Sequence, residues 1–230
     1  MVENKRITAV LFDLEDTLIQ TPWSDFQRVK EFRRKTREKL IALGIPSCLL
    51  EGIERATLMR NKSYEYAEKN FSRTENERFH RELEEFLSEY ELDSAKNSKL
   101  FPDTIPTLQE LKKLGLKIGL VTNTSEKAVN IIFKLHGLKG YFDVVITREK
   151  VKQLKPSPEG ILLAIKTLGV NDFFMVGDLL FDVLAAKNAN GTAIFVKRDF
   201  QEKDDPPADY VVHSLIEIPA IVQEKLALRK

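Results

Sequence analysis

The chain has 230 residues, 43% of them hydrophobic and 31% charged, with a net charge of +1. This length suits one large α/β core or a core with a smaller inserted domain. A charge balance so near zero gives no basis for bulk electrostatic binding of nucleic acid or of an anionic membrane. No apolar segment approaches the ~20 residues of a membrane-spanning helix, and the single cysteine, Cys48, cannot form an internal disulfide. These features predict a cytoplasmic protein that binds neither nucleic acid nor membrane.

Three acidic residues follow the first predicted strand. Residues 7–12 form a short, continuous apolar run, which is typical of a strand buried on both faces of a parallel sheet. The run ends at Asp13, and Glu15 and Asp16 follow directly. A carboxylate in this place lies at the edge of an α/β sheet where ligands bind. Because neighbouring acids repel one another, a cation or a catalytic role explains the cluster better than its alternative, a solvated acidic loop.

The next segment has a helical pattern. Ser24 is the expected cap of its first helix, and Thr74 with Glu77 matches a capping box at the start of its last. The first helix is basic and the last is acidic, so we expect their charges to pair within a small bundle rather than to attract an anionic substrate. The apolar spacing predicts helices over 24–44, 47–60, 64–69 and from 74 onward.

From residue 101 onward, strands and helices alternate. This alternation predicts a parallel sheet with helices on both faces, a Rossmann-like α/β fold. The first strand is separated from the others by the helical segment, so we expect a core, residues 1–20 and 98–230, interrupted by an α-helical bundle over 21–97. The predicted strands are 116–121, 143–147, 173–176, 192–196 and 210–212, and the predicted helices are 104–114, 126–136, 158–168, 181–189 and 215–228.

Polar residues that are suited to binding or catalysis recur near the ends of these later strands. Thr122 and Asn123 offer a hydroxyl and backbone N–H groups that suit phosphate oxygens, although an ordinary turn has the same composition. Lys155 precedes a Pro-x-Pro segment that fixes the start of a helix. Asp178 ends an apolar strand, and Asp182 follows one helical turn later. Hard oxygen ligands of this kind suit Mg²⁺, while Asp182 alone could also cap a helix.

Together these residues resemble the four motifs of the haloacid dehalogenase-like (HAD) hydrolase superfamily. Residues 13–17, DLEDT, resemble motif I, which is normally Asp-x-Asp-x-Thr; Thr122 matches motif II, Lys155 matches motif III, and Gly-Asp-x-x-x-Asp at 177–182 matches motif IV. The helical insertion between motifs I and II is similar to the C1-type cap of the phosphoglycolate phosphatase-like subgroup. The presence of all four motifs in this order argues against a purely structural role for these residues.

The resemblance implies a Mg²⁺-dependent phosphomonoester hydrolase that acts on a small phosphorylated metabolite. Asp13 would attack phosphorus and become an aspartyl phosphate, and Glu15 would be the general acid and base. Thr122, Asn123 and Lys155 would bind the transferring phosphoryl group. The implied metal ligands are Asp13, the backbone carbonyl of Glu15, Asp178 and, through water, Asp182.

Glu15 departs from the family pattern, which has Asp at this position. The extra methylene moves the acidic proton unless the turn adapts, and a misplacement of ~1 Å can cost about a hundredfold in rate. We therefore expect a slow phosphatase that prefers good leaving groups. The alternatives are a catalytically impaired phosphate-ester-binding or regulatory protein on the same fold, and a 2-haloacid dehalogenase, which the acids of motif IV disfavour. In the helical segment, the candidates to reach the substrate are Arg55, Arg60 and Lys62, each with solvent exposure as its expected role.

Overall fold

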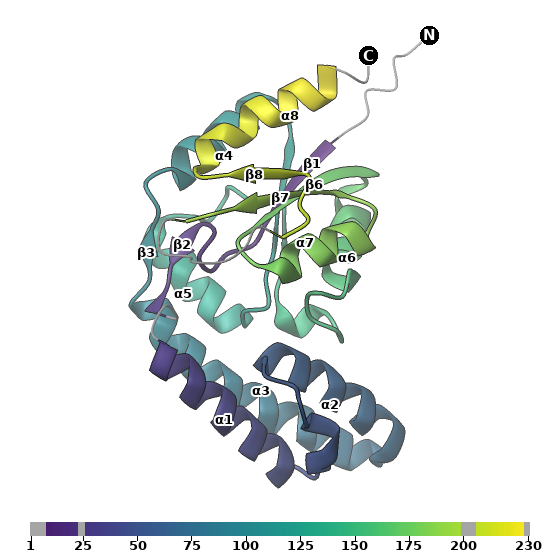
Figure 1. The fold of residues 1–230 in the computed structure, drawn as a ribbon. Helices are drawn as coiled ribbons and strands as arrows, with labels where there is room; N and C mark the ends of the chain where they lie inside the picture. The colour runs from purple at the N-terminus through teal and green to yellow at the C-terminus, as the bar shows by residue number, and fades with distance from the viewer. Residues whose placement is uncertain (1–7, 23–25, 199–205, 228–230) are drawn as a thin grey trace.

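The computed structural model describes residues 8–22, 26–198 and 206–227, and its main feature is a six-stranded parallel sheet (Figure 1). The strand order is β5-β4-β1-β6-β7-β8, and every neighbouring pair is parallel. The predicted parallel α/β fold is therefore confirmed. The strands are β1 (Thr8–Phe12), β4 (Lys117–Val121), β5 (Val144–Ile146), β6 (Asp172–Gly177), β7 (Thr192–Val196) and β8 (Tyr210–Val212), while β2 (Ile19–Gln20) and β3 (Lys99–Leu100) form a separate antiparallel pair.

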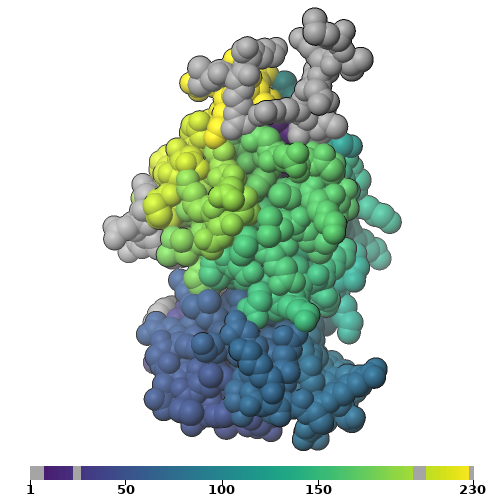
Figure 2. All heavy atoms as spheres, turned by 90° about the vertical axis from the view of Figure 1, so that its right-hand side faces the viewer, coloured from purple at the N-terminus to yellow at the C-terminus, as the bar shows by residue number. Residues whose placement is uncertain are grey.

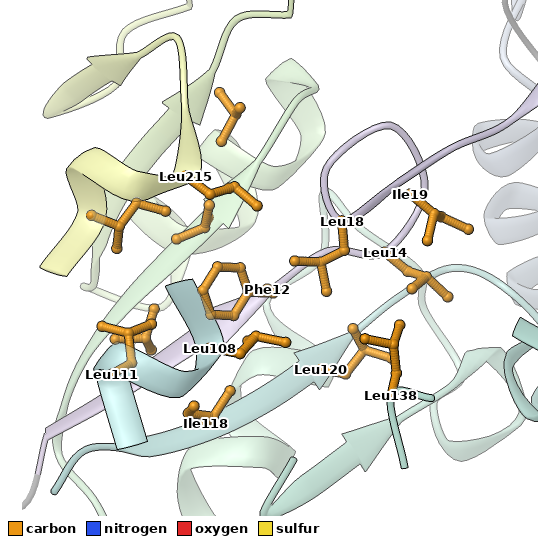
Figure 3. Close-up of a cluster of buried hydrophobic side chains, with 14 of the residues drawn as sticks. Phe12, Leu14, Leu18, Ile19, Leu108, Leu111, Ile118, Leu120, Leu138 and Leu215 are labelled. Carbon is orange, nitrogen blue, oxygen red and sulfur yellow. The ribbon is translucent and has the colours of Figure 1, made fainter. Parts of the chain in front are cut away.

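Helices cover both faces of the sheet because its central strands are apolar on both sides. In β1, Val10 and Phe12 contribute to one buried cluster, and Ala9 and Leu11 contribute to the other. Figure 3 shows Phe12 close to Leu108 in the first of these clusters. The helices on that face are α4 (Thr104–Lys113), α5 (Glu126–His136) and α8 (Ile218–Ala227), and those on the other are α6 (Glu159–Leu168) and α7 (Leu180–Asn188).

Three long helices lie together at one end of the molecule (Figure 1). They are α1 (Phe26–Ala42), α2 (Ala56–Asn70) and α3 (Arg73–Lys96), and they share an apolar cluster of their own. We call this bundle the cap. It interrupts the core between β2 and β3, which agrees with the predicted insertion, while the division into domains at residues 21–97 stays a prediction. Ser24, the expected N-cap residue of the first helix, lies outside the described residues.

The predicted boundaries within the cap were partly wrong. Residues 47–60 do not form one helix: a short 3₁₀ turn, η2 (Ser47–Leu50), ends before Gly52, whose φ of 71° breaks the helical path. The expected helices at 47–60 and 64–69 are replaced by the single helix α2. The polar residues near the middle of α2 are buried inside the protein and do not mark a break between two helices. The capping box of α3 joins Ser72 to Glu75, not Thr74 to Glu77, because the extended backbone at Ser72 aims its hydroxyl at the Glu75 N–H.

The charges of the cap pair in two ways. Between helices, Arg28 of α1 pairs with Asp93 of α3 at 2.7 Å, and Lys39 pairs with Glu82 at 3.3 Å. Other charges of α1 pair within that helix, as in Arg34 with Glu38. The expected pairing of the basic and acidic helices is thus present at two positions, where exposure to solvent limits its effect on stability to about 0–1 kcal/mol per pair.

Two further short turns complete the chain path in the core. They are η3 (Arg148–Lys150), directly after β5, and η4 (Leu215–Glu217), so that the predicted closing helix at 215–228 begins as a 3₁₀ turn and continues as α8. Within the described ranges, no helix has both the length and the apolar character that a membrane span requires.

Candidate active site

The carboxyl ends of three neighbouring strands bring the predicted site residues together. Strands β4, β1 and β6 lie side by side, and Thr122, Asp13 and Asp178 are the residues that directly follow them. The Asp13 N–H donates to the Val176 carbonyl at 2.9 Å, which continues the ladder one residue beyond β1. All three side chains are nevertheless buried, with exposures of 3–7%. This is the sheet edge at which ligands bind in open α/β folds.

Lys155 connects two of the predicted acids. Its Nζ donates to Asp13 Oδ1 and to Asp182 Oδ1, each at 2.6 Å, and to the Val121 carbonyl at 2.9 Å. Burial raises the pKa of Asp13 to about 6, with Lys155 opposing the shift and Asp182 adding to it. For Lys155, burial acts to lower the pKa, but the charges of Asp13 and Asp182 outweigh it and hold the pKa above its usual value. The lysine therefore stays charged between the two carboxylates.

Asn123 fixes the backbone on both sides of this lysine. Its Oδ1 accepts from the Lys155 N–H at 3.1 Å, and its Nδ2 donates to the Lys155 carbonyl at 3.4 Å. The Thr122 hydroxyl is oriented by Thr124: it accepts from the Thr124 N–H at 3.2 Å and donates to its hydroxyl at 3.0 Å. The side chain of Asn123 thus positions Lys155, a task that its place in the sequence did not reveal.

Three carboxylates form a group that a divalent cation can occupy. Asp13, Asp178 and Asp182 each offer an oxygen, and these oxygens lie within 4.8 Å of one another. Hard carboxylate oxygens are the donors that Mg²⁺ takes, so the residues fit such an ion. Asp182 is already held by Lys155 and by the Leu179 N–H, which donates to Oδ2 at 3.0 Å, and Thr17 donates to Asp178 at 3.4 Å. The side chains are therefore fixed before any ion arrives.

Gly177 leaves the space that Asp182 fills. A Cβ at Gly177 would lie 2.2 Å from Asp182 Cγ, which no packing tolerates. We expect Gly177→Ala to displace Asp182 and to weaken binding of Mg²⁺ by roughly 10- to 100-fold, the usual effect of disturbing the partners of a metal site. Calorimetric titration with Mg²⁺ measures this. The control is Ala189→Gly, which changes the residue that follows the end of α7, away from the site. Gly140→Ala is not used, because the φ of 93° at Gly140 disfavours alanine. An unaltered affinity for Mg²⁺ in Gly177→Ala would contradict the expectation.

Glu15 lies half-buried beside the other acids. Burial raises its pKa to about 8, and the negative charges of Glu91, Asp13 and Asp16 add to the shift. The Asp16 carboxylate is held by Thr21: it accepts from the Thr21 N–H at 3.0 Å and from the Thr21 hydroxyl at 3.2 Å, and the Asp16 backbone has a φ of 55°. Asp16 therefore shapes the turn, while a Glu15 that keeps its proton near neutral pH can donate it to a leaving oxygen.

A cavity of about 470 Å³ lies between this edge of the core and the cap. Its volume suits a small molecule. The core contributes the predicted acids, Thr122, Asn123 and Lys155 to the wall, and the cap contributes apolar and basic side chains, including Val29, Phe32 and Arg55. Figure 2 shows the cap helices in blue directly against the core in green.

A buried ionic network joins cap and core beside this cavity. Arg148 of η3, only 2% exposed, bonds to Glu84 and Glu91 of α3 and donates to the Ser88 hydroxyl at 3.2 Å. Glu91 also accepts from the Ser125 N–H at 2.9 Å at the start of α5. Arg148 was not among the residues predicted from the sequence, although its place shortly after β5, at the same sheet edge as Asp13, was a usable signal.

Two cap residues contact the loop that carries Lys155. Arg60 is 2% exposed; it donates to Glu84 and to the Lys152 carbonyl, both at 3.0 Å, so its predicted solvent exposure was wrong. Asn61 exchanges two hydrogen bonds with the backbone of Leu154, at 2.8 and 2.9 Å. Burial of these polar groups is offset by their partners across the interface. Lys62, by contrast, is exposed as expected.

The family model for haloacid dehalogenase-like hydrolases matches residues 7–190. The chain belongs to this family. The Pyrophosphatase PpaX of Bacillus velezensis is 34% identical over 197 residues, 81% of each chain. The N-acetylmuramic acid 6-phosphate phosphatase of Pseudomonas putida is 28% identical over 227 residues, 96% of this chain and 98% of that protein. The crystal structure of a HAD phosphatase from Thermococcus onnurineus is 31% identical, with a TM-score of 0.58 over 94% of this chain and 98% of that one. The predicted HAD resemblance is thus confirmed.

Proposed function

We propose that this HAD-like hydrolase is a phosphatase that cleaves small phosphomonoesters through an aspartyl phosphate on Asp13, with Mg²⁺ as its cofactor. The observation that carries the proposal is the placement of Asp13 at the sheet edge, bonded to the Lys155 ammonium and grouped with Asp178 and Asp182. A carboxylate nucleophile needs such cationic neutralisation to approach an anionic phosphoryl group. A cytoplasmic location stays a prediction from the sequence.

In the first half-reaction, a carboxylate oxygen of Asp13 bonds to phosphorus, and the bond from phosphorus to the leaving oxygen breaks. Glu15 gives its proton to that oxygen, so that a neutral alcohol departs. Lys155 and the Thr122 hydroxyl hold the non-bridging phosphoryl oxygens, and Asn123 keeps Lys155 in place. Asp13, the Glu15 carbonyl, Asp178 and, through water, Asp182 would hold Mg²⁺, which would supply additional positive charge to the phosphoryl group.

In the second half-reaction, water replaces Asp13 on phosphorus. The ionised Glu15 takes a proton from this water, which attacks phosphorus and breaks the bond to Asp13. Inorganic phosphate leaves, Asp13 is again a carboxylate, and Glu15 again holds a proton. The cap covers this site through the contacts of Arg60 and Asn61 with the Lys155 loop, which supports exclusion of bulk water.

The test is phosphate release from a panel of aryl and alkyl phosphomonoesters, with and without Mg²⁺. We expect Mg²⁺-dependent turnover that is absent from the Asp13→Asn variant. One relative is named as a pyrophosphatase and another as an N-acetylmuramic acid 6-phosphate phosphatase. Inorganic pyrophosphate and a sugar phosphate therefore belong in the panel. Release at the rate of Asp13→Asn on every compound would contradict the proposal.

Glu15 favours a second candidate function, a protein that binds phosphate esters without efficient turnover. If the additional methylene of Glu15 misplaces the acidic proton, Glu15→Asp raises the rate on alkyl phosphates by about 10- to 100-fold, since a displacement of ~1 Å has that effect. Aryl phosphates, whose leaving groups need little protonation, are the internal control and change less. A Glu15→Asp variant that is no faster on alkyl phosphates would show that the turn already places Glu15 correctly.

A further inference from the structure

Two arginines of the cap line the cavity. Arg33 of α1 and Arg55, the residue before α2, line the same cavity as Asp13. Across residues 8–22, 26–198 and 206–227, neither arginine forms an ion pair, whereas Arg60 and Arg148 of the same wall are both bonded to Glu84. No salt bridge with a described residue therefore offsets the positive charge of Arg33 or Arg55.

Contacts fix where these charges lie. The Arg55 guanidinium carbon is 5.8 Å from the ring centroid of Phe181, and Phe181 directly precedes Asp182 in the chain. Arg55 thus lies above the stretch that carries the acids of motif IV. Burial lowers the pKa of Arg33, and the charge of Arg55 lowers it further, with only Glu54 opposing, so the two guanidinium groups are close enough to repel each other.

Four of the six acids that line the cavity already have bonding partners within the protein. Glu91 is bonded to Arg148 and to the Ser125 N–H. Asp16 accepts two hydrogen bonds from Thr21. Asp13 and Asp182 are bonded to Lys155 at the phosphoryl end. The neighbouring cations of Arg33 and Arg55 are consequently open to an anion that arrives with the ligand.

We propose that Arg33 and Arg55 bind a second anionic group on the leaving part of the substrate, a carboxylate or a second phosphate. This inference rests on the proposed function of the site, because it assigns the phosphoryl group to Asp13 and Lys155. Guanidinium groups bind carboxylate and phosphate oxygens through paired, charge-assisted hydrogen bonds. The substrate class is then a small compound with a phosphoryl group at one end and a second anion at the other, short enough to enter a cavity of about 470 Å³.

Binding of phosphonates tests the inference independently of turnover, since their carbon–phosphorus bond resists phosphatase chemistry. Ethylphosphonate carries one anionic group, phosphonoacetate adds a carboxylate, and methylenediphosphonate adds a second phosphonate. We measure their Kd by calorimetry in excess Mg²⁺ with the unaltered protein, Arg33→Gln, Arg55→Gln and Arg34→Gln. Arg34 is the matched control because it is an exposed arginine of the same helix that lies outside the cavity wall.

We expect the unaltered protein to prefer a ligand with two anions, and we expect Arg33→Gln and Arg55→Gln each to reduce that preference by roughly 10- to 100-fold, the range for a lost charged hydrogen bond. Arg34→Gln leaves it unchanged. Tighter binding of phosphonoacetate assigns the pocket to a carboxylate, and tighter binding of methylenediphosphonate assigns it to a phosphate. Thermal melting establishes that each variant is folded.

The inference is overturned if the unaltered protein does not prefer either two-anion ligand over ethylphosphonate. It is also overturned if the variants lose affinity for all three ligands equally, or if Arg34→Gln has the same effect as Arg33→Gln. Hydrolysis of an aryl phosphate by the same preparation is recorded in parallel. Turnover without a preference for two anions contradicts only this inference, whereas a preference without turnover contradicts only the proposed hydrolysis.

Discussion

Replacement of Lys155 by methionine is expected to reduce phosphate release by about a thousandfold or more. Loss of one group that stabilises transition-state charge in an enclosed site costs about 10²–10³ in kcat, and Lys155 contacts two acids as well. Without its ammonium, the charge of Asp182 acts on Asp13 unopposed, and the pKa of Asp13 rises further above its present value of about 6. A larger share of the nucleophile is then protonated near neutral pH.

The measurement is steady-state phosphate release from an aryl phosphate between pH 5 and pH 9. Lys152→Met is the matched control, because Lys152 lies three residues earlier, is 73% exposed at its side chain and pairs with Glu68 at 2.7 Å. We expect the control to retain its activity within about twofold, in line with the small effects of exposed pairs. Activity of Lys155→Met within tenfold of the unaltered protein would contradict the assigned role of Lys155.

Replacement of Arg148 by methionine is expected to lower the free energy of unfolding by about 3–5 kcal/mol, the usual result of removing one partner from a buried ion pair. The carboxylates of Glu84 and Glu91 would keep other contacts, with Arg60 and with the Ser125 N–H, but each would lose its bond to Arg148. For Glu84, burial acts to raise the pKa, and the charges of Arg148 and Arg60 outweigh it.

Unfolding in urea measures the loss. Arg73→Met is the control, because Arg73 is 93% exposed and its pair with Glu77 contributes little. Adding Glu91→Gln to Arg148→Met removes the unpaired charge and is expected to restore part of the stability. A change below about 1 kcal/mol in Arg148→Met would mean that water replaces the lost bonds and that the network does not hold the cap to the core.

The sequence was informative about the core because parallel strands impose a simple geometry. Their carboxyl ends meet at one edge, so Asp13, Thr122 and Asp178 could be expected together without knowing any side-chain contact. The grouping of Asp182 followed from its spacing of one helical turn. Lys155 was expected beside the nucleophile Asp13, whereas its bond to Asp182 was not foreseen from the sequence.

The cap was less predictable because its polar residues are used inside the protein. Arg60 and Asn61 interrupt the apolar pattern of α2, and their partners, Glu84 and the backbone of Leu154, are distant in sequence. Periodicity treats such residues as solvent-facing or as a break, which is why α2 was predicted as two pieces. Only the tertiary fold shows that these groups join cap and core.

The measurement that tests the central claim most directly is chemical trapping of the phosphorylated protein. An aryl phosphate is mixed with the unaltered protein and quenched rapidly, and borohydride then reduces any acyl phosphate, which converts the aspartate side chain to that of homoserine. Mass spectrometry of the peptides locates the change. We predict reduction at position 13, dependent on substrate and absent without it. Substrate turnover without modification of Asp13, or modification of a different carboxylate, would contradict the account.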